Sequence, residues 1–300
     1  MAEPLRRLAV LTHFVTGTTQ NALAELAALR SEFQLELLLP QDEAAKHPQV
    51  EEQGYRVVPE SELRAADACL VFGGDGTILR ALGRMLSSGV PTLGVNFGNV
   101  GFLASLPHEG WRDGLAEMVE GRYSVAELLT VEARLGGRQF TAVNDIVLTR
   151  TQPRGVLHLQ YSISGTPLGT MRCDGMIIAT PTGSTAYNLS CGGPLAVWDA
   201  NVLLLNFVAP HSLGFRPIVL RPDHEIVVSS MSDCGEVEVV IDGAVVGLLG
   251  CDDVLRVSAS PLRARLLVGE GVSFYRNVEQ KLFGFGVDAH GADAHGPDAD

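Results

Sequence analysis

The sequence lacks paired cysteines, long apolar runs and an excess of positive charge. Its five cysteines are scattered and none lies in a C-x-x-C pair, which argues against a zinc site or a disulfide framework and fits a reducing compartment. No stretch approaches the ~18 apolar residues of a membrane span, and the apolar run over residues 8–11 is too short for a secretion signal. The net charge of −13 argues against nucleic acid and anionic membranes as partners. We therefore expect a soluble, cytoplasmic protein.

Two common nucleotide-binding motifs are also missing. The sequence contains no G-x-x-x-x-G-K-S/T, which excludes a P-loop enzyme, and its glycines at 73, 74 and 76 do not form G-x-G-x-x-G because residue 79 is leucine. What the chain has instead is Gly73-Gly74-Asp75-Gly76-Thr77, between apolar residues 69–72 and a helix-like pattern over residues 78–86. This order predicts a buried strand, a tight turn and a helix N-terminus, whose free N–H groups favour anions and phosphate above all.

Asp75 is the unusual member of this loop. A carboxylate repels phosphate, so a loop that only held phosphate would omit it. Asp75 fits if it holds a cation or accepts a proton. The alternative is that Asp75 caps the helix while the glycines turn the chain, and the local sequence leaves both interpretations open.

Residues 1–122 predict an α/β domain. Short apolar strands alternate with helices, a pattern typical of a mostly parallel sheet covered on both faces. Residues 41–66 are charged and interrupted by proline and glycine, which indicates a surface loop around one short strand. Ligands of such sheets bind at the carboxyl ends of the strands, where the loops 73–77 and 96–102 both lie. Strands are expected over residues 8–11, 35–39, 55–58, 69–72 and 92–96.

Residues 123–268 predict a second domain, all-β and sandwich-like, because short strands alternate with turn signals. One strand is expected over residues 140–148, and two separate strands over residues 254–257 and 264–268. A helix is expected to follow residues 182–185. Hairpin turns are expected at Gly136-Gly137, Ser164-Gly165 and Asp242-Gly243.

The end of the chain predicts two further segments. Residues 269–285 mix apolar and charged side chains, as in a terminal helix or an extended arm. The tail over residues 286–300 repeats Asp-Ala-His and is expected to be disordered. Metal binding by His290 and His295 is the less favoured alternative.

Three further stretches carry polar groups that packing alone does not require. Asn144 and Asp145 interrupt a strand-like run although both are poor strand formers, so they lie at a bulge or face a polar ligand such as a ribose or a base amide. Residues 172–175 form a charged cluster between two apolar segments. Residues 180–190 gather hydroxyls and a glycine before the expected helix, and they either cap it or bind phosphate or base edges.

Together these motifs carry a resemblance to the NAD kinase family. Residues 73–77, Gly94-Val95-Asn96 with Gly101-Phe102-Leu103, Asn144-Asp145, and residues 174–187 occur in the order and spacing of that family. The resemblance covers about residues 8–283. It implies a Rossmann-like N-terminal α/β domain, a C-terminal β domain with NAD bound between the two, and a last segment that returns to the first domain. It also implies a homo-oligomer, a dimer or a tetramer.

The same resemblance implies the reaction. The family transfers the terminal phosphate of ATP, in some members also of polyphosphate, to the 2′-hydroxyl of the adenosine ribose of NAD, giving NADP. Mg2+ or another divalent cation would neutralise the donor phosphates, and no protein ligand of the metal is predicted. Asp75 resembles the proton acceptor of the family. The positions that match ligand-binding residues are Asp75, Gly76, Arg80, Asn144, Asp145, Arg172, Asp174, Thr182, Thr185, Ala186, Tyr187, Asn188, Leu189, Ser190 and Ala209.

The sequence departs from the family pattern at two positions. Ala244 stands where many members carry glutamine, and Asp145 replaces the common glutamate. Two alternatives remain. One is a lipid or sugar kinase with a similar glycine-rich loop, which the acidic composition disfavours. The other is a non-catalytic NADP-binding sensor on the same scaffold, which the presence of Asp75 disfavours.

Overall fold

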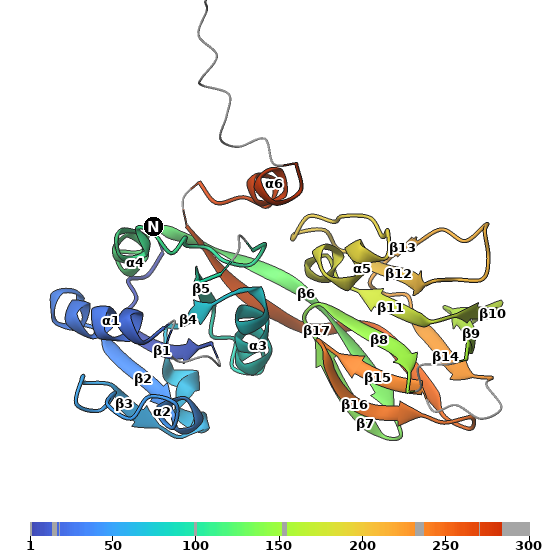
Figure 1. Ribbon diagram of the computed structural model, residues 1–300, viewed down its shortest axis with the longest axis horizontal. Helices are drawn as coiled ribbons and strands as arrows, with labels where there is room; N and C mark the ends of the chain where they lie inside the picture. The colour runs from blue at the N-terminus through green and yellow to red at the C-terminus, as the bar shows by residue number, and fades with distance from the viewer. Residues whose placement is uncertain are drawn as a thin grey trace, which may run out of the picture.

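The computed structural model describes residues 2–13, 17, 19–98, 101–151, 155–231, 237–269 and 271–283. Figure 1 shows an N-terminal part built of helices and a sheet, a C-terminal part built of strands, and two long strands that run from one part into the other. The predicted tail over residues 286–300 lies outside the described residues, as do residues 99 and 100 of one predicted loop. No described helix is long and apolar enough to cross a membrane.

The N-terminal part is a parallel sheet with strand order β5-β4-β1-β2-β3. Alternate residues of β4 point to opposite faces: Leu70 and Phe72 pack beneath α1 and α4, whereas Cys69 and Val71 pack beneath α3. The prediction of a parallel sheet covered on both faces is therefore confirmed. The elements are β1 (Arg7–Thr12), α1 (Gln20–Phe33), β2 (Glu36–Pro40), β3 (Arg56–Val58), β4 (Ala68–Gly73), α3 (Asp75–Met85), β5 (Thr92–Asn96) and α4 (Trp111–Val119).

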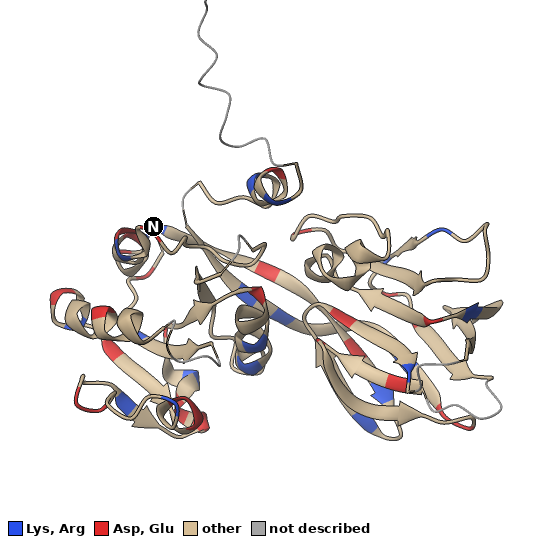
Figure 2. Ribbon diagram, in the orientation of Figure 1, with Lys and Arg blue, Asp and Glu red and all other residues tan. Residues whose placement is uncertain are grey.

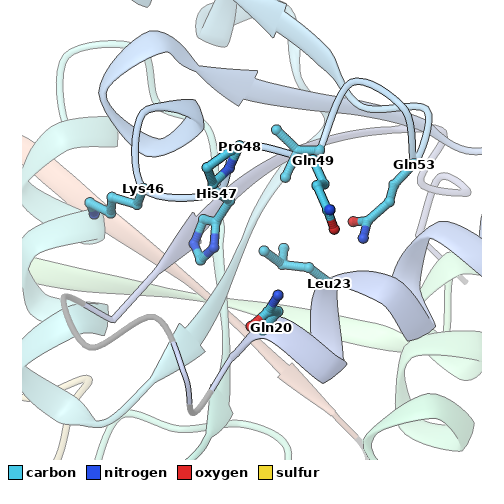
Figure 3. Close-up of a pocket in the computed structure, with 8 residues that line it drawn as sticks. Gln20, Leu23, Lys46, His47, Pro48, Gln49 and Gln53 are labelled. Atoms are coloured by element: carbon cyan, nitrogen blue, oxygen red, sulfur yellow. The ribbon is translucent and has the colours of Figure 1, made fainter.

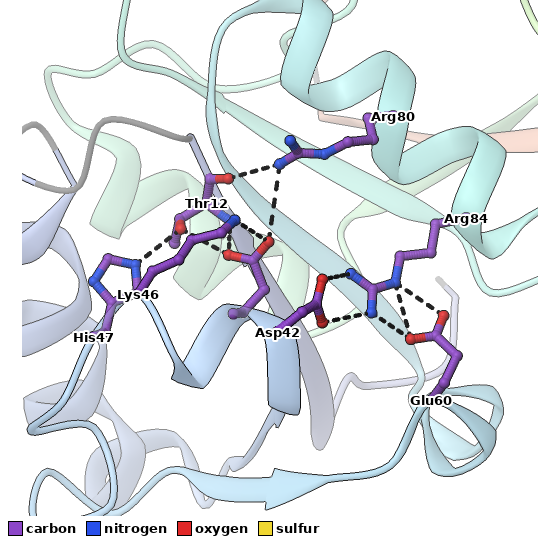
Figure 4. Close-up of polar contacts among 8 residues, drawn as sticks. Thr12, Asp42, Lys46, His47, Glu60, Arg80 and Arg84 are labelled. Carbon is purple, nitrogen blue, oxygen red and sulfur yellow. Dashed lines mark hydrogen bonds and ion pairs between the residues drawn. The ribbon is translucent and has the colours of Figure 1, made fainter. Parts of the chain in front are cut away.

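The prediction that residues 41–66 form a surface loop is wrong for much of the segment. It contains α2 (Gln41–Ala44) and the 3-10 helix η2 (Glu60–Ala65) beside the expected strand β3. Arg84 of α3 donates to both carboxylate oxygens of Asp42 and also bonds Glu60 (Figure 4). The charges that suggested a solvated loop are thus partly used to tie α2 and η2 to α3.

The C-terminal part is a sandwich of two sheets. The sheet β13-β12-β11-β8-β15-β16 packs on β6, β7, β9, β10, β14 and β17 through one continuous apolar core. The three predicted hairpin turns are confirmed, each with two successive residues of positive φ. The strands are β6 (Tyr123–Leu135), β7 (Arg138–Ala142), β8 (Asp145–Arg150), β9 (Leu157–Ile163), β10 (Thr166–Cys173), β11 (Gly175–Ala179), β12 (Leu203–Val208), β13 (Ile218–Leu220), β14 (Ile226–Ser230), β15 (Val237–Ile241), β16 (Ala244–Leu249) and β17 (Val254–Gly269).

Three predictions for this part need correction. The single strand expected over residues 140–148 is two strands, because β7 ends at Ala142 in one sheet and β8 begins at Asp145 in the other. The helix expected after residues 182–185 is the single turn α5 (Tyr187–Ser190). The strands expected over residues 254–257 and 264–268 are one strand, β17.

Strand β17 joins the two parts. It pairs with β6 along its length, and Leu266 near its end pairs in parallel with Thr92 of β5. The parallel sheet of the N-terminal part is therefore continuous with one sheet of the sandwich (Figure 1). The division of the chain into residues 1–122 and 123–268 stays a prediction, and both β6 and β17 contribute to the sheet on each side of it.

The C-terminal segment forms α6 (Phe274–Val278) followed by the π-helical turn η4 (Glu279–Phe283). The Asn277 side-chain amide donates to the Phe102 carbonyl over 3.1 Å. Phe274 packs edge to face on Trp198, with ring centroids 5.7 Å apart. The segment therefore contacts the loop that follows β5 in the N-terminal part and, through Trp198, the C-terminal part as well.

Candidate active site

Asp75 is the first residue of α3, and Gly74 before it is the cap residue. The Asp75 carboxylate accepts two hydrogen bonds from the loop after β5, one from the Phe102 N–H over 2.8 Å and one from the Leu103 N–H over 3.0 Å. A Cβ atom at Gly101 would lie 2.0 Å from this carboxylate, so only glycine fits there. The interpretation of Asp75 as a helix cap does not hold, because its side chain joins two loops at the carboxyl edge of the sheet.

Arg80 lies farther along α3, where Figure 2 shows basic residues on the helix, and it faces the end of β1. Its guanidinium donates to the Thr12 carbonyl over 2.9 Å and stands 3.8 Å from Glu43. Glu43 is only 1% exposed, and its carboxylate also accepts from Thr12 and from Lys46 (Figure 4). Sequence reasoning missed Glu43 because the charged segment around it predicted a solvated loop.

A cavity of about 330 Å³ lies beside this network (Figure 3). Burial lowers the pKa of His47, against the opposing effect of Glu43, so the imidazole that lines the cavity favours its neutral form. The ammonium of Lys46 is already paired with Glu43 over 2.6 Å. This cavity therefore does not match the phosphate site expected beside Asp75. It is lined by Gln20, Leu23, Lys46, His47, Pro48, Gln49, Val50 and Gln53.

Asn144 and Asp145 lie where the chain passes from one sheet to the other, and a third residue fixes them there. The Asp242 carboxylate accepts from the backbone N–H groups of Val143, Asn144 and Asp145 over 2.8, 2.8 and 3.2 Å. Sequence reasoning assigned Asp242 only to a hairpin turn, which it also forms, with φ at 46°. Its carboxylate bonds to residues nearly a hundred positions earlier, which no local pattern reveals.

The carboxyl of Asp145 is buried close to that of Asp242. Burial, and then the charge of Asp242, raise the pKa of Asp145 to about 7. Burial also raises the pKa of Asp242, although its three backbone N–H donors oppose the rise. Near neutral pH, Asp145 is therefore poised between its two protonation states in the ligand-free protein.

The stretch over residues 180–185 lies directly on Asn144. The Thr180 N–H donates to the Asn144 carbonyl over 2.9 Å, and the Thr180 hydroxyl donates to the Val143 carbonyl over 2.6 Å. Among the described residues, the buried Asn144 Oδ1 and Thr182 Oγ1 have no hydrogen-bond partner. Buried polar groups are normally satisfied, so these two atoms are suited to bind a polar ligand.

Tyr187 and Asn188 of α5 have different environments. Tyr187 is 43% exposed, and burial followed by the charges of Cys191, Asp174 and Asp145 raises its pKa. The Asn188 amide is fully buried and donates to the Pro194 carbonyl over 3.1 Å, so its side chain holds the loop together. The Thr185 hydroxyl donates to the Thr182 carbonyl over 3.1 Å. Of the remaining predicted positions in this run, Ala186 and Leu189 are partly buried and Ser190 is exposed.

Arg172, Asp174 and Ala209 gather at the opposite end of β11 from Asp145. Asp174 forms an ion pair over 3.3 Å with Arg150, a residue that the sequence did not single out. Arg172 is exposed, and Ala209 has a φ of 44°, an uncommon conformation for a residue other than glycine. The predicted positions thus form two groups along β11.

The group around Asn144 and the Asp75 loop share one apolar core. Leu103, next to the Phe102 that binds Asp75, belongs to the same buried cluster as Val143, next to Asn144. Trp198 and Phe274 complete the cluster from the sandwich and from α6. The Asp75 loop therefore packs on the same apolar cluster as residues 143–145, where the chain passes from one sheet to the other. We call these three residues the Asn144 corner.

Replacing Gly183 by Ala is expected to disrupt the Asn144 corner. A Cβ atom at Gly183 would lie 2.1 Å from the Asn144 carbonyl oxygen, a backbone atom that cannot move without β8. We expect a loss of about 1–3 kcal/mol in the free energy of unfolding, typical of overpacking, which denaturant unfolding measures. Gly83→Ala is the control, because its Cβ meets nothing within 4 Å. An unchanged free energy of unfolding in Gly183→Ala would contradict the role given to this contact.

Comparison with known proteins supports the resemblance. Residues 4–123 match the ATP-NAD kinase N-terminal domain and residues 143–268 the C-terminal domain. The NAD kinase of Symbiobacterium thermophilum is 38% identical over 226 residues, covering 73% of this chain and 79% of that protein. The NAD kinase of Bordetella parapertussis is 36% identical over 242 residues, covering 76% and 80%.

Two solved structures share the fold. Yeast NADH kinase complexed with NADH superposes with a TM-score of 0.85 at 23% identity, covering 95% of this chain and 89% of that one. An NAD kinase from Archaeoglobus fulgidus in complex with ATP has a TM-score of 0.72 at 25% identity, covering 93% and 97%. Both domain matches and the curated relatives agree, and this chain belongs to the NAD kinase family.

Proposed function

We propose that the protein transfers the terminal phosphate of ATP to the 2′-hydroxyl of the adenosine ribose of NAD, giving NADP. Its membership of the NAD kinase family supports the substrates, since relatives have been solved with NADH and with ATP. The observation that carries the chemistry is the Asp75 carboxylate, held by two backbone N–H groups at the anion-favouring start of α3.

Asp75 is the proposed proton acceptor. The 2′-oxygen forms a bond to the terminal phosphorus of ATP, the bond from that phosphorus to the bridging oxygen breaks, and ADP leaves with the electron pair. The hydroxyl proton passes to Asp75. Phosphoryl transfer depends mainly on positioning and charge stabilisation, and the bonds from Phe102 and Leu103 fix the direction of the carboxylate. Asp75 thus orients the hydroxyl as well as accepting its proton.

The dinucleotide is proposed to lie along β11. The unpartnered oxygens of Asn144 and Thr182, together with Asp145, would bind hydroxyls or base edges at one end. Asp174, Arg172 and Ala209 would contact the nicotinamide end. Tyr187 supports this path, because its raised pKa, due first to burial and then to Cys191, also reflects Asp174 at one end of β11 and Asp145 at the other. Gly76 and Arg80 of α3, and Thr185, Ala186, Asn188, Leu189 and Ser190 around α5, complete the proposed contacts.

A divalent cation is proposed to arrive with the donor. In the part of the chain that the structure describes, no three His, Cys, Asp or Glu side chains converge to hold a metal ion. The phosphates of ATP would therefore be the main ligands of Mg2+, which is common for this ion. The bound ion would offset the charge that the phosphates carry into the site, and the chain's own residues still position the acceptor hydroxyl.

Three further properties are proposed: the oligomeric state, a second phosphate donor and the cellular compartment. The family resemblance supports a homodimer or homotetramer and polyphosphate as a second donor. Val219, Val245 and Leu248 on the second sheet of the sandwich are 55%, 59% and 42% exposed, which leaves apolar surface for such an assembly. The cysteines are scattered, and Cys69 and Cys173 are buried free thiols. Free thiols are typical of a reducing compartment, which supports a location in the cytoplasm.

A coupled assay tests the proposal. Purified protein is incubated with ATP, Mg2+ and NAD, and the product is measured with an NADP-specific dehydrogenase, so that only the 2′-phosphorylated dinucleotide is counted. Steady formation of NADP is expected. Tight NADP binding without turnover would support the sensor instead, and phosphorylation of a lipid or a sugar in its place would support the other alternative.

NAD is expected to be preferred over NADH by about five-fold in kcat/KM. The proposed nicotinamide end lies beside Asp174, whose carboxylate attracts the positive ring of NAD. Arg150, 3.3 Å from Asp174, and the exposed Arg172 at the same end limit the effect. A screened charge contact of this kind contributes up to ~1 kcal/mol. Steady-state kinetics with both acceptors measure the ratio, and Asp174→Asn should reduce it. Equal kcat/KM for NAD and NADH would contradict the prediction.

A further inference from the structure

The C-terminal segment brings a cation to the proposed proton acceptor. The Lys281 ammonium in η4 lies 3.8 Å from an Asp75 oxygen and 4.4 Å from the centre of the Phe102 ring. The sequence contains only two lysines, Lys46 and Lys281. Both stand against a carboxylate, since Lys46 pairs with the buried Glu43. Sequence reasoning did not single out Lys281, because it lies 206 positions after Asp75.

Phe102 connects this cation to the loop that holds Asp75. Its N–H donates to the same Asp75 oxygen that Lys281 faces, its ring lies beneath the ammonium, and its carbonyl accepts from Asn277 of α6. Phe274 anchors the segment in the apolar core. Lys281 therefore approaches Asp75 from a docked helix rather than from a freely moving arm.

The charges at the site suggest what the contact between Lys281 and Asp75 does. The start of α3 favours phosphate, but an ionised Asp75 repels the same phosphate. A cation within about 4 Å offsets that repulsion without occupying the N–H groups of the helix. The side chains of Lys281 and Asp75 are 37% and 32% exposed, so solvent screens the interaction and its effect is moderate.

We propose that Lys281 is a positioning residue for phosphoryl transfer, which compensates the charge of Asp75 so that the donor phosphates can approach. The inference rests on the proposed function of Asp75. It assigns to the C-terminal segment a role in donor binding, and it separates that role from acceptor binding, which the Asn144 corner performs.

A double-mutant cycle on donor binding tests the inference. The affinity for β,γ-methylene ATP is measured by calorimetry in NAD-saturated protein, with Asp75 or Asn at position 75 and with Lys281 or Met at position 281. Lys281→Met is expected to weaken binding roughly five-fold beside Asp75, the size of a screened charge contact. It should change binding less than about two-fold beside Asn, because without the carboxylate the exposed, flexible ammonium is no longer held at the start of α3. NAD affinity should stay the same throughout.

Control variants exclude simpler explanations. Lys281→Arg should restore donor affinity. Arg276→Met removes the same charge from the same segment. Arg276 lines a cavity with Asn96 and Gly101 of the loop that holds Asp75 but has no ion pair with Asp75 among the described contacts, so donor affinity should fall clearly less than in Lys281→Met. Equal losses in both backgrounds, an unchanged affinity of Lys281→Met, or an equal loss in Arg276→Met would each overturn the inference.

A second measurement follows the contact without using activity. Reductive methylation with 13C-formaldehyde keeps the charge of each lysine and gives NMR signals from only two side chains besides the N-terminus. Asp75→Asn should shift the Lys281 signal and leave that of Lys46 in place, and an unmoved Lys281 signal would contradict the contact. If Asp75→Asn retained normal turnover in the coupled assay, the proposed role of Asp75 as proton acceptor would fail instead, whatever the result for Lys281; absence of NADP formation by the wild type would refute the proposed function itself.

Discussion

Replacing Asp75 by Asn is expected to lower kcat by about 10²–10⁴-fold, the usual contribution of a positioned general base. The dissociation constant for NAD should change far less, because the residues that we propose to bind the dinucleotide, Asn144, Asp145 and Thr182, are unchanged. Stopped assays for kcat and calorimetry for NAD binding measure the two effects separately. A loss of kcat with nearly unchanged NAD affinity is the result that identifies a residue acting in the chemical step.

The Asp75→Asn substitution should also lower stability, although the Asp and Asn side chains are similar in size. Each carboxylate oxygen of Asp75 accepts from a different backbone N–H, so an Asn amide must turn its own N–H groups toward one of these donors. We expect a loss of about 1–2 kcal/mol in the free energy of unfolding. Near-normal turnover in the variant would remove Asp75 as proton acceptor. Equal losses of turnover and NAD affinity would make it a binding residue.

Replacing Asp145 by Asn is expected to stabilise the ligand-free protein at pH 8. The folded-state pKa of Asp145, about 7, lies above its ordinary value of 3.8. The stability that the neutral carboxyl provides is therefore fully present below pH ~4 and is lost as pH rises through 7. At about 1.4 kcal/mol for each pH unit the upper bound is about 4 kcal/mol, and coupling to Asp242 reduces it, so we expect a gain of about 1–4 kcal/mol.

Thermal unfolding at two pH values measures this gain. It should be large at pH 8 and nearly vanish about one pH unit below the ordinary pKa of 3.8, where wild-type Asp145 is neutral in the folded state and mostly neutral in the unfolded state. Asp174→Asn is the matched control and should not stabilise, since Asp174 is a third exposed and paired with Arg150. A gain of the same size at both pH values would show that burial of the Asp145 charge is not the cause.

The same substitution should weaken NAD binding. We propose that an ionised Asp145 accepts hydrogen bonds from ligand hydroxyls, and bonds to a charged acceptor are worth about 1.5–3 kcal/mol. NAD affinity of the wild type should therefore rise between pH 6 and pH 8, whereas that of Asp145→Asn should be flat. If Asp145→Asn raises the free energy of unfolding but lowers the affinity for NAD, the buried charge of Asp145 serves function at a cost in stability.

Local patterns were sufficient where the contacts are local. The apolar run, the glycines and the helical period around Asp75 predicted β4, the turn and α3, because all three are determined by neighbouring residues. The same reasoning placed one strand across residues 140–148, since the apolar pattern continues through the corner at which the chain changes sheets. Nothing in that pattern shows the carboxylate of Asp242, which bonds the corner from 97 to 99 positions away.

Charged residues were the hardest to interpret. Glu43 and Lys281 lie in segments predicted as a surface loop and as a terminal helix or arm, and Arg150 ends strand β8. Each pairs with a site residue far along the sequence. A charge in a loop carries no sequence period that separates a solvated side chain from a paired one. The ligand-binding positions were named from family resemblance, and their contacts with NAD and ATP remain predictions.

The pairing of β17 with β5 also limits how the chain can be synthesised and divided. Residues 94–96 of β5 pair with Leu106, but until residue 266 has left the ribosome the start of β5 around Thr92 remains an open edge that can pair with another chain. The first sheet thus cannot be completed before residue 266 has emerged, although its other strands are parallel neighbours that come earlier in the sequence. A fragment that stops after the N-terminal domain match would keep that edge exposed permanently, so the two matched domains are not independent modules for expression or exchange.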